Sequence, residues 1–129
     1  NTLLTRLWIE NNKSKYKDLC SEWKNSNREH IREYSKKYKI DNPGIINSLI
    51  AKRRAVKKKA TPSWLSKDQL LEIRNFYIKA KKAENQSGVK MQVDHIIPLQ
   101  GEIVSGLHVP WNLRIISAFE NQKKHNKII

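Results

Sequence analysis

A pattern of aromatic, asparagine and apolar positions recurs every 15 residues in the first 49 residues of the chain. In each copy the asparagine follows the aromatic residue by four positions, and apolar residues follow the asparagine by four and seven. The three copies are Trp8, Asn12, Tyr16 and Leu19; Trp23, Asn27, Ile31 and Tyr34; and Tyr38, Asn42, Ile46 and Leu49. Such self-similarity indicates one structural unit used three times.

Each unit is predicted to be a short helix that begins at its asparagine. Asparagine is a strong N-cap residue, and Pro43 after Asn42 suits the first helical position. The apolar residues at +4 and +7 lie on one helical face, and the next aromatic at +11 extends that face. Helices this short are marginal alone in water, so we expect them to order on packing or on DNA. The alternative is a solvated helical spacer with the same periodicity.

The second half of the chain reads as helix, strand, loop, strand and helix. Ser66 to Gln69 forms a capping box, and a helical apolar stripe follows to about residue 82. A β-branched run predicts a strand over 91–97, and a second strand is expected over 112–116. Another capping box, Ser117 to Glu120, opens a helix predicted over 117–127. The fold class expected from these elements is α+β, with a mainly helical N-terminal region.

Charge points to a polyanionic partner. The chain has 26 Lys and Arg against 12 Asp and Glu, a net charge of +14. Residues 1–60 hold 16 basic and 6 acidic residues, net +10, and residues 61–129 hold net +4. Nucleic acid is the favoured partner, because no broad apolar face backs the basic stretch as membrane-surface binding requires. We therefore divide the chain into a DNA-binding repeat region, 1–60, and a second domain, 61–129.

The densest basic run follows the third repeat. It could track a DNA backbone, lie in a minor groove, or be a solvated helix end or linker. Its basic residues are Lys52, Arg53, Arg54, Lys57, Lys58 and Lys59.

Other composition limits the class of protein. A single cysteine, Cys20, excludes an internal disulfide and a cysteine-based zinc site within one chain, and fits a reducing cytoplasm. No run approaches the roughly 18 apolar residues of a membrane span.

Five residues at the ends of the predicted elements carry the candidate chemistry. Asp94 and His95 end the first strand, Asn112 opens the second, and Asn121 and His125 are four apart on the last helix, hence on one face. A carboxylate, an amide oxygen and an imidazole form a plausible metal site. A regular strand points Asp94 and His95 to opposite sides, so aiming both at one site requires a local bend.

Three sequence runs carry a family resemblance. They are Val-Asp-His-Ile-Ile-Pro-Leu, Gly-Leu-His-Val-Pro-Trp-Asn-Leu and Glu-Asn-Gln-Lys-Lys-His-Asn, within residues 93–126. This segment resembles the HNH endonucleases, particularly phage-borne and homing-type members. The upstream Thr-Pro-Ser-Trp-Leu-Ser-Lys-Asp-Gln run is also similar, which extends the resemblance over residues 60–129. It implies a ββα-metal fold, a two-stranded antiparallel hairpin plus a helix.

The resemblance also implies roles. His95 would be the general base, Asp94 and Asn121 would hold one divalent metal, and Asn112 would fix the loop that orients His95. His125 matches a further metal ligand of some members. Mg²⁺ or Mn²⁺ suits Asp plus Asn, whereas Zn²⁺ or Ni²⁺ is favoured if His125 ligates.

Four further residues have candidate roles. Arg114 is a candidate phosphate contact. His108 either holds the loop or contacts phosphate, and the loop role is preferred. Trp64 and Trp111 are expected to pack in the core.

The function expected is therefore metal-dependent hydrolysis of DNA phosphodiester bonds, as a nick or a double-strand break, in the cytoplasm of a host cell if the gene is phage-borne. The alternatives are a DNA-binding protein that keeps the HNH fold without catalysis, and a ribonuclease or nuclease toxin. No membrane partner is expected, and the oligomeric state is left open.

Overall fold

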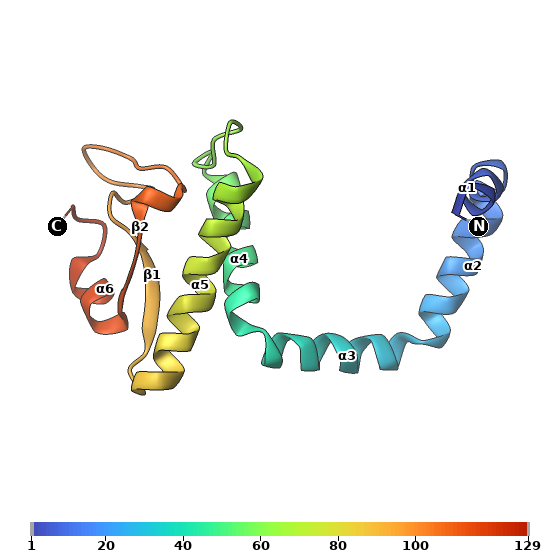
Figure 1. Ribbon diagram of the computed structural model, residues 1–129, viewed down its shortest axis with the longest axis horizontal. Helices are drawn as coiled ribbons and strands as arrows, with labels where there is room; N and C mark the ends of the chain where they lie inside the picture. Colours follow the sequence, from blue (N-terminus) through green and yellow to red (C-terminus); the bar gives the residue numbers. More distant parts are fainter. Residues whose placement is uncertain (1, 129) are drawn as a thin grey trace. The chain divides into compact units, whose positions relative to one another are not determined.

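The computed structural model describes residues 2–128 and divides between Asp41 and Asn42 into two compact units (Figure 1). The first unit contains α1 (Thr2–Asn11), α2 (Lys13–Ser26) and α3 (Arg28–Asp41). The second contains α4 (Pro43–Lys57), α5 (Lys67–Ser87), β1 (Met91–His95), the 3₁₀ turn η1 (Pro110–Asn112), β2 (Leu113–Ser117) and α6 (Ala118–Lys124). The α+β class is confirmed: the chain is mostly helical with a two-stranded antiparallel hairpin.

The asparagines of the repeat separate successive helices, as predicted, but Asn12 does so by a different contact. The Asn12 side chain makes no N-cap hydrogen bond to α2. Its Nδ2 instead donates to the Trp8 carbonyl at 2.9 Å, and Asn27 Nδ2 donates to the Trp23 carbonyl at 2.8 Å. The expectation of an N-cap side chain was therefore wrong at Asn12, and it was also wrong at Asn42, whose side chain makes no cap hydrogen bond to α4. Each amide donates to a carbonyl in the last turn of the preceding helix, and the Trp23 carbonyl also accepts the Asn27 backbone N–H at 2.9 Å.

The third repeat helix, α4, packs along α5 in the second unit (Figure 1). Small residues, Gly44, Ser48 and Ala55, are buried on α4, and Ile73 and Ala80 are buried on α5. A Cβ on Gly44 would lie 2.9 Å from Ile78 Cα, so only glycine permits this approach. The units therefore divide at 41/42, whereas charge and repeats set the expected division at 60/61.

The hairpin lies between α5 and α6 (Figure 1). β1 and β2 are antiparallel, with Asp94 opposite Arg114 and His95 opposite Leu113. Both predicted capping boxes form, at Ser66 with Gln69 and at Ser117 with Glu120. Several bounds differ from those expected: α5 continues through Ser87 to the left-handed Gly88, β1 ends at His95, and α6 ends at Lys124.

Trp64 and Trp111 are not in the core, contrary to expectation. They are 61% and 59% exposed, and their rings stack on each other with centroids 6.0 Å apart and planes at 9°. Each indole thus covers part of the other's apolar surface without interior neighbours enclosing it.

Within residues 2–128 we find no helix with the length and apolar character needed to cross a bilayer.

Candidate functional site

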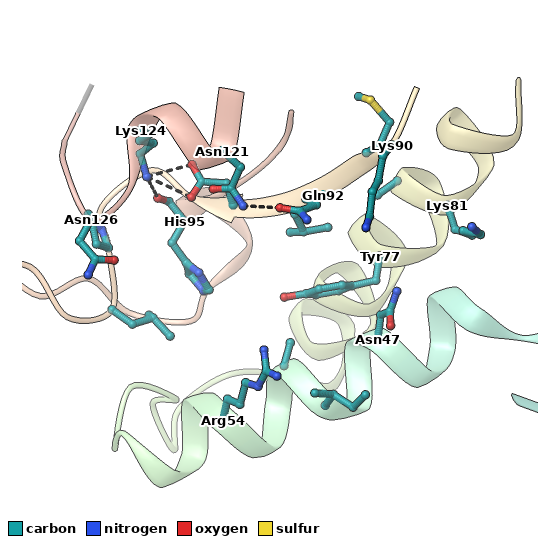
Figure 2. A pocket seen from close by; sticks show the side chains of 18 of the residues that line it. Asn47, Arg54, Tyr77, Lys81, Lys90, Gln92, His95, Asn121, Lys124 and Asn126 are labelled. Atoms are coloured by element: carbon teal, nitrogen blue, oxygen red, sulfur yellow. Dashed lines mark hydrogen bonds and ion pairs between the residues drawn. The ribbon is translucent and has the colours of Figure 1, made fainter. Parts of the chain in front are cut away.

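One cavity of the second unit, of about 710 Å³, gathers six of the twelve candidate site residues. It is bounded by α4, α5, β1, the loop after β1 and the end of α6 (Figure 2). The candidate residues that line it are Arg54, Lys58, Asp94, His95, Asn121 and His125. Lys124 also lines it, a residue that the sequence reasoning missed.

Asn112 is a buried clamp on the loop that follows β1. Its Oδ1 accepts a hydrogen bond from Ile97 N at 2.8 Å, and its Nδ2 donates to the carbonyls of Ile97 at 3.0 Å and Leu107 at 2.8 Å. A Cβ on Gly106 would lie 2.3 Å from the Ile97 carbonyl oxygen and 2.7 Å from Asn112 Nδ2. Only glycine at position 106 therefore leaves room for the hydrogen bonds of Asn112. Asn112 thereby joins both ends of the loop next to His95.

His95 is paired with a second histidine. Its Nε2 lies 2.9 Å from Nδ1 of His108, whose side chain is 1% exposed. His108 is held by its backbone N–H, which donates to the Ala60 carbonyl at 2.8 Å. The sequence predicted that His108 holds the loop, but it did not predict this contact with His95. No local sequence pattern brings residues 95 and 108 together.

The pKa of His95 is lowered from 6.5 to about 4, mainly by burial; the charges of His108, Lys124 and Lys58 act in the same direction, and Asp94 opposes them. Burial also lowers the pKa of His108. Both imidazoles are therefore neutral near pH 7, and one ring must donate to the other across the 2.9 Å contact. A neutral imidazole has a free lone pair that can accept a proton.

Asp94 is 8% exposed and lies between two cationic side chains. Lys124 Nζ is 3.0 Å from Oδ1 and 2.9 Å from Oδ2, and Arg114 Nε is 3.1 Å from Oδ2. Arg114 reaches Asp94 because the two residues are directly opposite in the hairpin register. The guanidinium expected to contact phosphate is thus engaged by a carboxylate.

Lys124 is 2% exposed and also donates to the His95 carbonyl at 2.6 Å (Figure 2). One turn before it, Asn121 Nδ2 donates to Gln92 Oε1 at 2.6 Å, which leaves the Asn121 amide oxygen as an acceptor. The spacing of Asn121 and Lys124 on one helical face was the signal available in the sequence.

His125 does not share a helical face with Asn121, contrary to expectation. It follows the last residue of α6 and adopts φ 51°, a left-handed conformation that non-glycine residues rarely adopt. Its side chain still lines the cavity.

The donor chemistry fits a hard divalent cation. Asp94 and Asn121 supply the carboxylate and amide oxygens that Mg²⁺ and Mn²⁺ take. A cationic group, the Lys124 ammonium, already lies on both Asp94 oxygens. Across residues 2–128 no group of three or more His, Cys, Asp or Glu side chains is placed to hold a metal ion.

The basic run contributes two residues to the cavity, one on α4 and one directly after its end. Arg54 and Lys58, four residues apart, line the cavity, and Lys58 Nζ donates to Gln100 Oε1 at 2.7 Å. Tyr77 of α5 also lines the cavity, and burial raises its pKa to about 12, so its hydroxyl stays protonated. The other basic residues of the run are exposed and do not line the cavity: Lys52, Arg53, Lys57 and Lys59.

No protein-family model, curated protein or solved structure matches this chain.

Proposed function

We propose that the chain is a metal-dependent DNA endonuclease of the HNH type, with β1, β2 and α6 as its ββα-metal fold. The observation that carries this proposal is one basic cavity in which a neutral histidine, His95, lies beside Asp94 and Asn121. Hydrolysis of a phosphodiester needs an activated water and relief of the charge that develops on phosphorus. The cavity contains groups for both tasks.

His95 is the proposed general base. In the tautomer in which His95 Nε2–H donates to His108 Nδ1, the lone pair of His95 Nδ1 is free to take the proton of the attacking water. His108 then fixes both the tautomer and the ring orientation, and the Asn112 clamp positions the loop beside them. A pKa of about 4 keeps His95 unprotonated and ready near neutral pH.

Asp94 and Asn121 are the proposed metal ligands, with Mg²⁺ or Mn²⁺ as the favoured ion. When bound, the ion would stabilise charge on the scissile phosphate and the leaving oxygen. Arg54 and Lys58 provide cationic contacts to the phosphate backbone on the opposite wall. His125, released from the helical geometry, is not needed as a ligand in this proposal.

The first unit is proposed to bind DNA. No residue of α1, α2 or α3 is buried within the part of the chain that the structure describes, and Trp8, Trp23 and Tyr34 are exposed among basic residues. Helices with exposed apolar stripes and positive charge can order against a DNA surface.

A second candidate is a DNA-binding protein without catalysis. The ion pairs of Asp94 with Lys124 and Arg114 favour it, because a carboxylate held in this way serves as a structural group. The two candidates differ in one observable, cleavage that depends on metal.

The deciding experiment is relaxation of supercoiled plasmid with Mg²⁺, Mn²⁺ or EDTA, alongside an RNA substrate. We expect cleavage of DNA with either ion and none with EDTA. His95→Ala should slow cleavage by about 10²–10⁴-fold without weakening DNA binding. The matched control is His30→Ala, an exposed histidine of α3, which should cleave as the wild type does. DNA binding without cleavage would favour the second candidate, and preferred cleavage of RNA would make the protein a ribonuclease.

A further inference from the structure

We propose that Lys124 is an internal competitor of the divalent metal for Asp94, so that metal binding requires the ammonium group to leave the carboxylate. The inference rests on the proposed function, because it takes Asp94 as a metal ligand. It assigns a role to a buried lysine that the cleavage mechanism does not use.

The contacts of Lys124 occupy the place that a metal would take. Its Nζ lies 3.0 Å from Oδ1 and 2.9 Å from Oδ2 of Asp94, an approach to both oxygens at once, as in a bidentate ligand. The third donor of the ammonium reaches the His95 carbonyl at 2.6 Å, so all its N–H groups are used. Mg²⁺ sits about 2.0–2.1 Å from its oxygen ligands, and an ion there would lie against the ammonium.

The charges around the cavity disfavour binding a divalent ion while the Lys124 ammonium remains on Asp94. Two carboxylates line it, Asp94 and Glu84, and Glu84 is ion-paired with Lys81. Asp94 already faces Lys124 and Arg114. A divalent ion bound beside the ammonium would place two cations on one carboxylate. The repulsion between the two cations would be weakly screened, because Asp94 and Lys124 are buried.

The same contacts keep the site assembled before a metal arrives. A buried carboxylate without a partner is costly, so the ammonium, together with Arg114, stabilises Asp94 in its position. Lys124 and Asn121 lie on one face of α6, so a lysine that swings away need not disturb the second proposed ligand (Figure 2). The lysine thus stabilises the metal-free protein and weakens its affinity for metal.

The test compares Mn²⁺ binding by calorimetry in the wild-type chain, Lys124→Met and Lys123→Met. Methionine keeps most of the apolar stem and removes the charge, and Lys123 is the exposed neighbour that matches the charge change. We expect Lys124→Met to bind Mn²⁺ more tightly by about tenfold, equivalent to about 1.4 kcal/mol, and to unfold at a lower temperature without metal. Lys123→Met should change neither property.

A second measurement uses the wild-type chain alone and does not depend on how the variant folds. Acetylation of lysine amines, read by mass spectrometry, should be slow at Lys124 and fast at Lys123 in the metal-free protein. Saturating Mn²⁺ should raise acetylation of Lys124 several-fold and leave Lys123 unchanged.

The outcomes separate this inference from the proposed function. Mn²⁺ binding that is lost in Asp94→Asn but not tightened in Lys124→Met, with Lys124 still protected when Mn²⁺ is bound, overturns the competition and leaves the nuclease proposal standing. No Mn²⁺ binding by either the wild type or Lys124→Met overturns both. If Lys124→Met does not fold, the acetylation result decides.

Discussion

The Nε2 atom of His95 lies 2.9 Å from the Nδ1 atom of His108, and burial lowers the pKa of both imidazoles. The pair therefore stays neutral in the folded protein at a pH where the unfolded chain takes up protons. This relationship links the stability of the domain to the state of the proposed base.

The first prediction concerns pH. His95 has a folded pKa of about 4 against an ordinary value of 6.5, so between these values the unfolded state binds more protons than the folded state. The stability that His95 contributes is full above pH 6.5 and falls as the pH drops toward about 4. Urea unfolding of the metal-free protein across this range should show the loss. His95→Gln, which cannot titrate, should show a shallower dependence, and an equal slope in both proteins would contradict the assignment.

The second prediction concerns the Asn112 clamp. Asn112→Ala removes three partly buried hydrogen bonds and leaves the Ile97 N–H and two carbonyls without the Asn112 side chain as partner. The free energy of unfolding should fall by roughly 2–4 kcal/mol. Asn75→Ala, at an exposed position of α5, is the control and should change stability by less than about 0.5 kcal/mol. A loss of similar size in both variants would mean that the clamp adds nothing specific.

The third prediction separates the two faces of the basic run. Arg54 lines the cavity and Arg53 does not, although they are neighbours with the same charge. Arg54→Ala should lower kcat/KM for DNA cleavage by about 10–100-fold, because it removes a cationic contact at the reacting phosphate. Arg53→Ala should mainly lower the affinity for DNA at higher salt. Steady-state cleavage by the two variants measures the difference, and equal losses would indicate a general charge effect.

The fourth prediction follows from the division at 41/42. Residues 1–41 hold 10 basic and 6 acidic residues, whereas residues 42–60 hold 6 basic and no acidic residues. A chain of residues 42–129 therefore keeps most of the positive charge, and it should keep metal-dependent cleavage at high DNA concentration. The slope of log affinity against log salt should flatten by about 2–4 units relative to the full chain.

A chain of residues 61–129, cut at the boundary that charge suggests, is the informative comparison. It lacks α4, which packs along α5 with a close approach at Gly44, so it should unfold more readily. An unchanged salt slope for residues 42–129 would make the first unit a spacer rather than a DNA-binding element.

Local features were predictable because their interactions connect residues close in sequence. The breaks at Asn12, Asn27 and Asn42 and the two capping boxes depend on backbone groups within about one helical turn. The α+β class followed from the same local signals. Even among these local features, the predicted N-cap hydrogen bond of Asn12 was wrong, because its side chain bonds to the preceding helix instead. An asparagine between two helices can satisfy either the carbonyls of the preceding helix or the N–H groups of the following one.

The sequence by itself determined the helical repeats, the strand and helix order, the positive charge and the residue types of the candidate site. Only the tertiary structure decided which groups meet: His108 on His95, Lys124 and Arg114 on Asp94, and Arg54 in the cavity. It also placed the third repeat helix on α5, through the close approach at Gly44. The contacts that build the site join segments up to 48 residues apart, as between Ala60 and His108, and depend on packing and burial. Periodicity reports which face a residue occupies, whereas its partner is set by the other elements packed against that face.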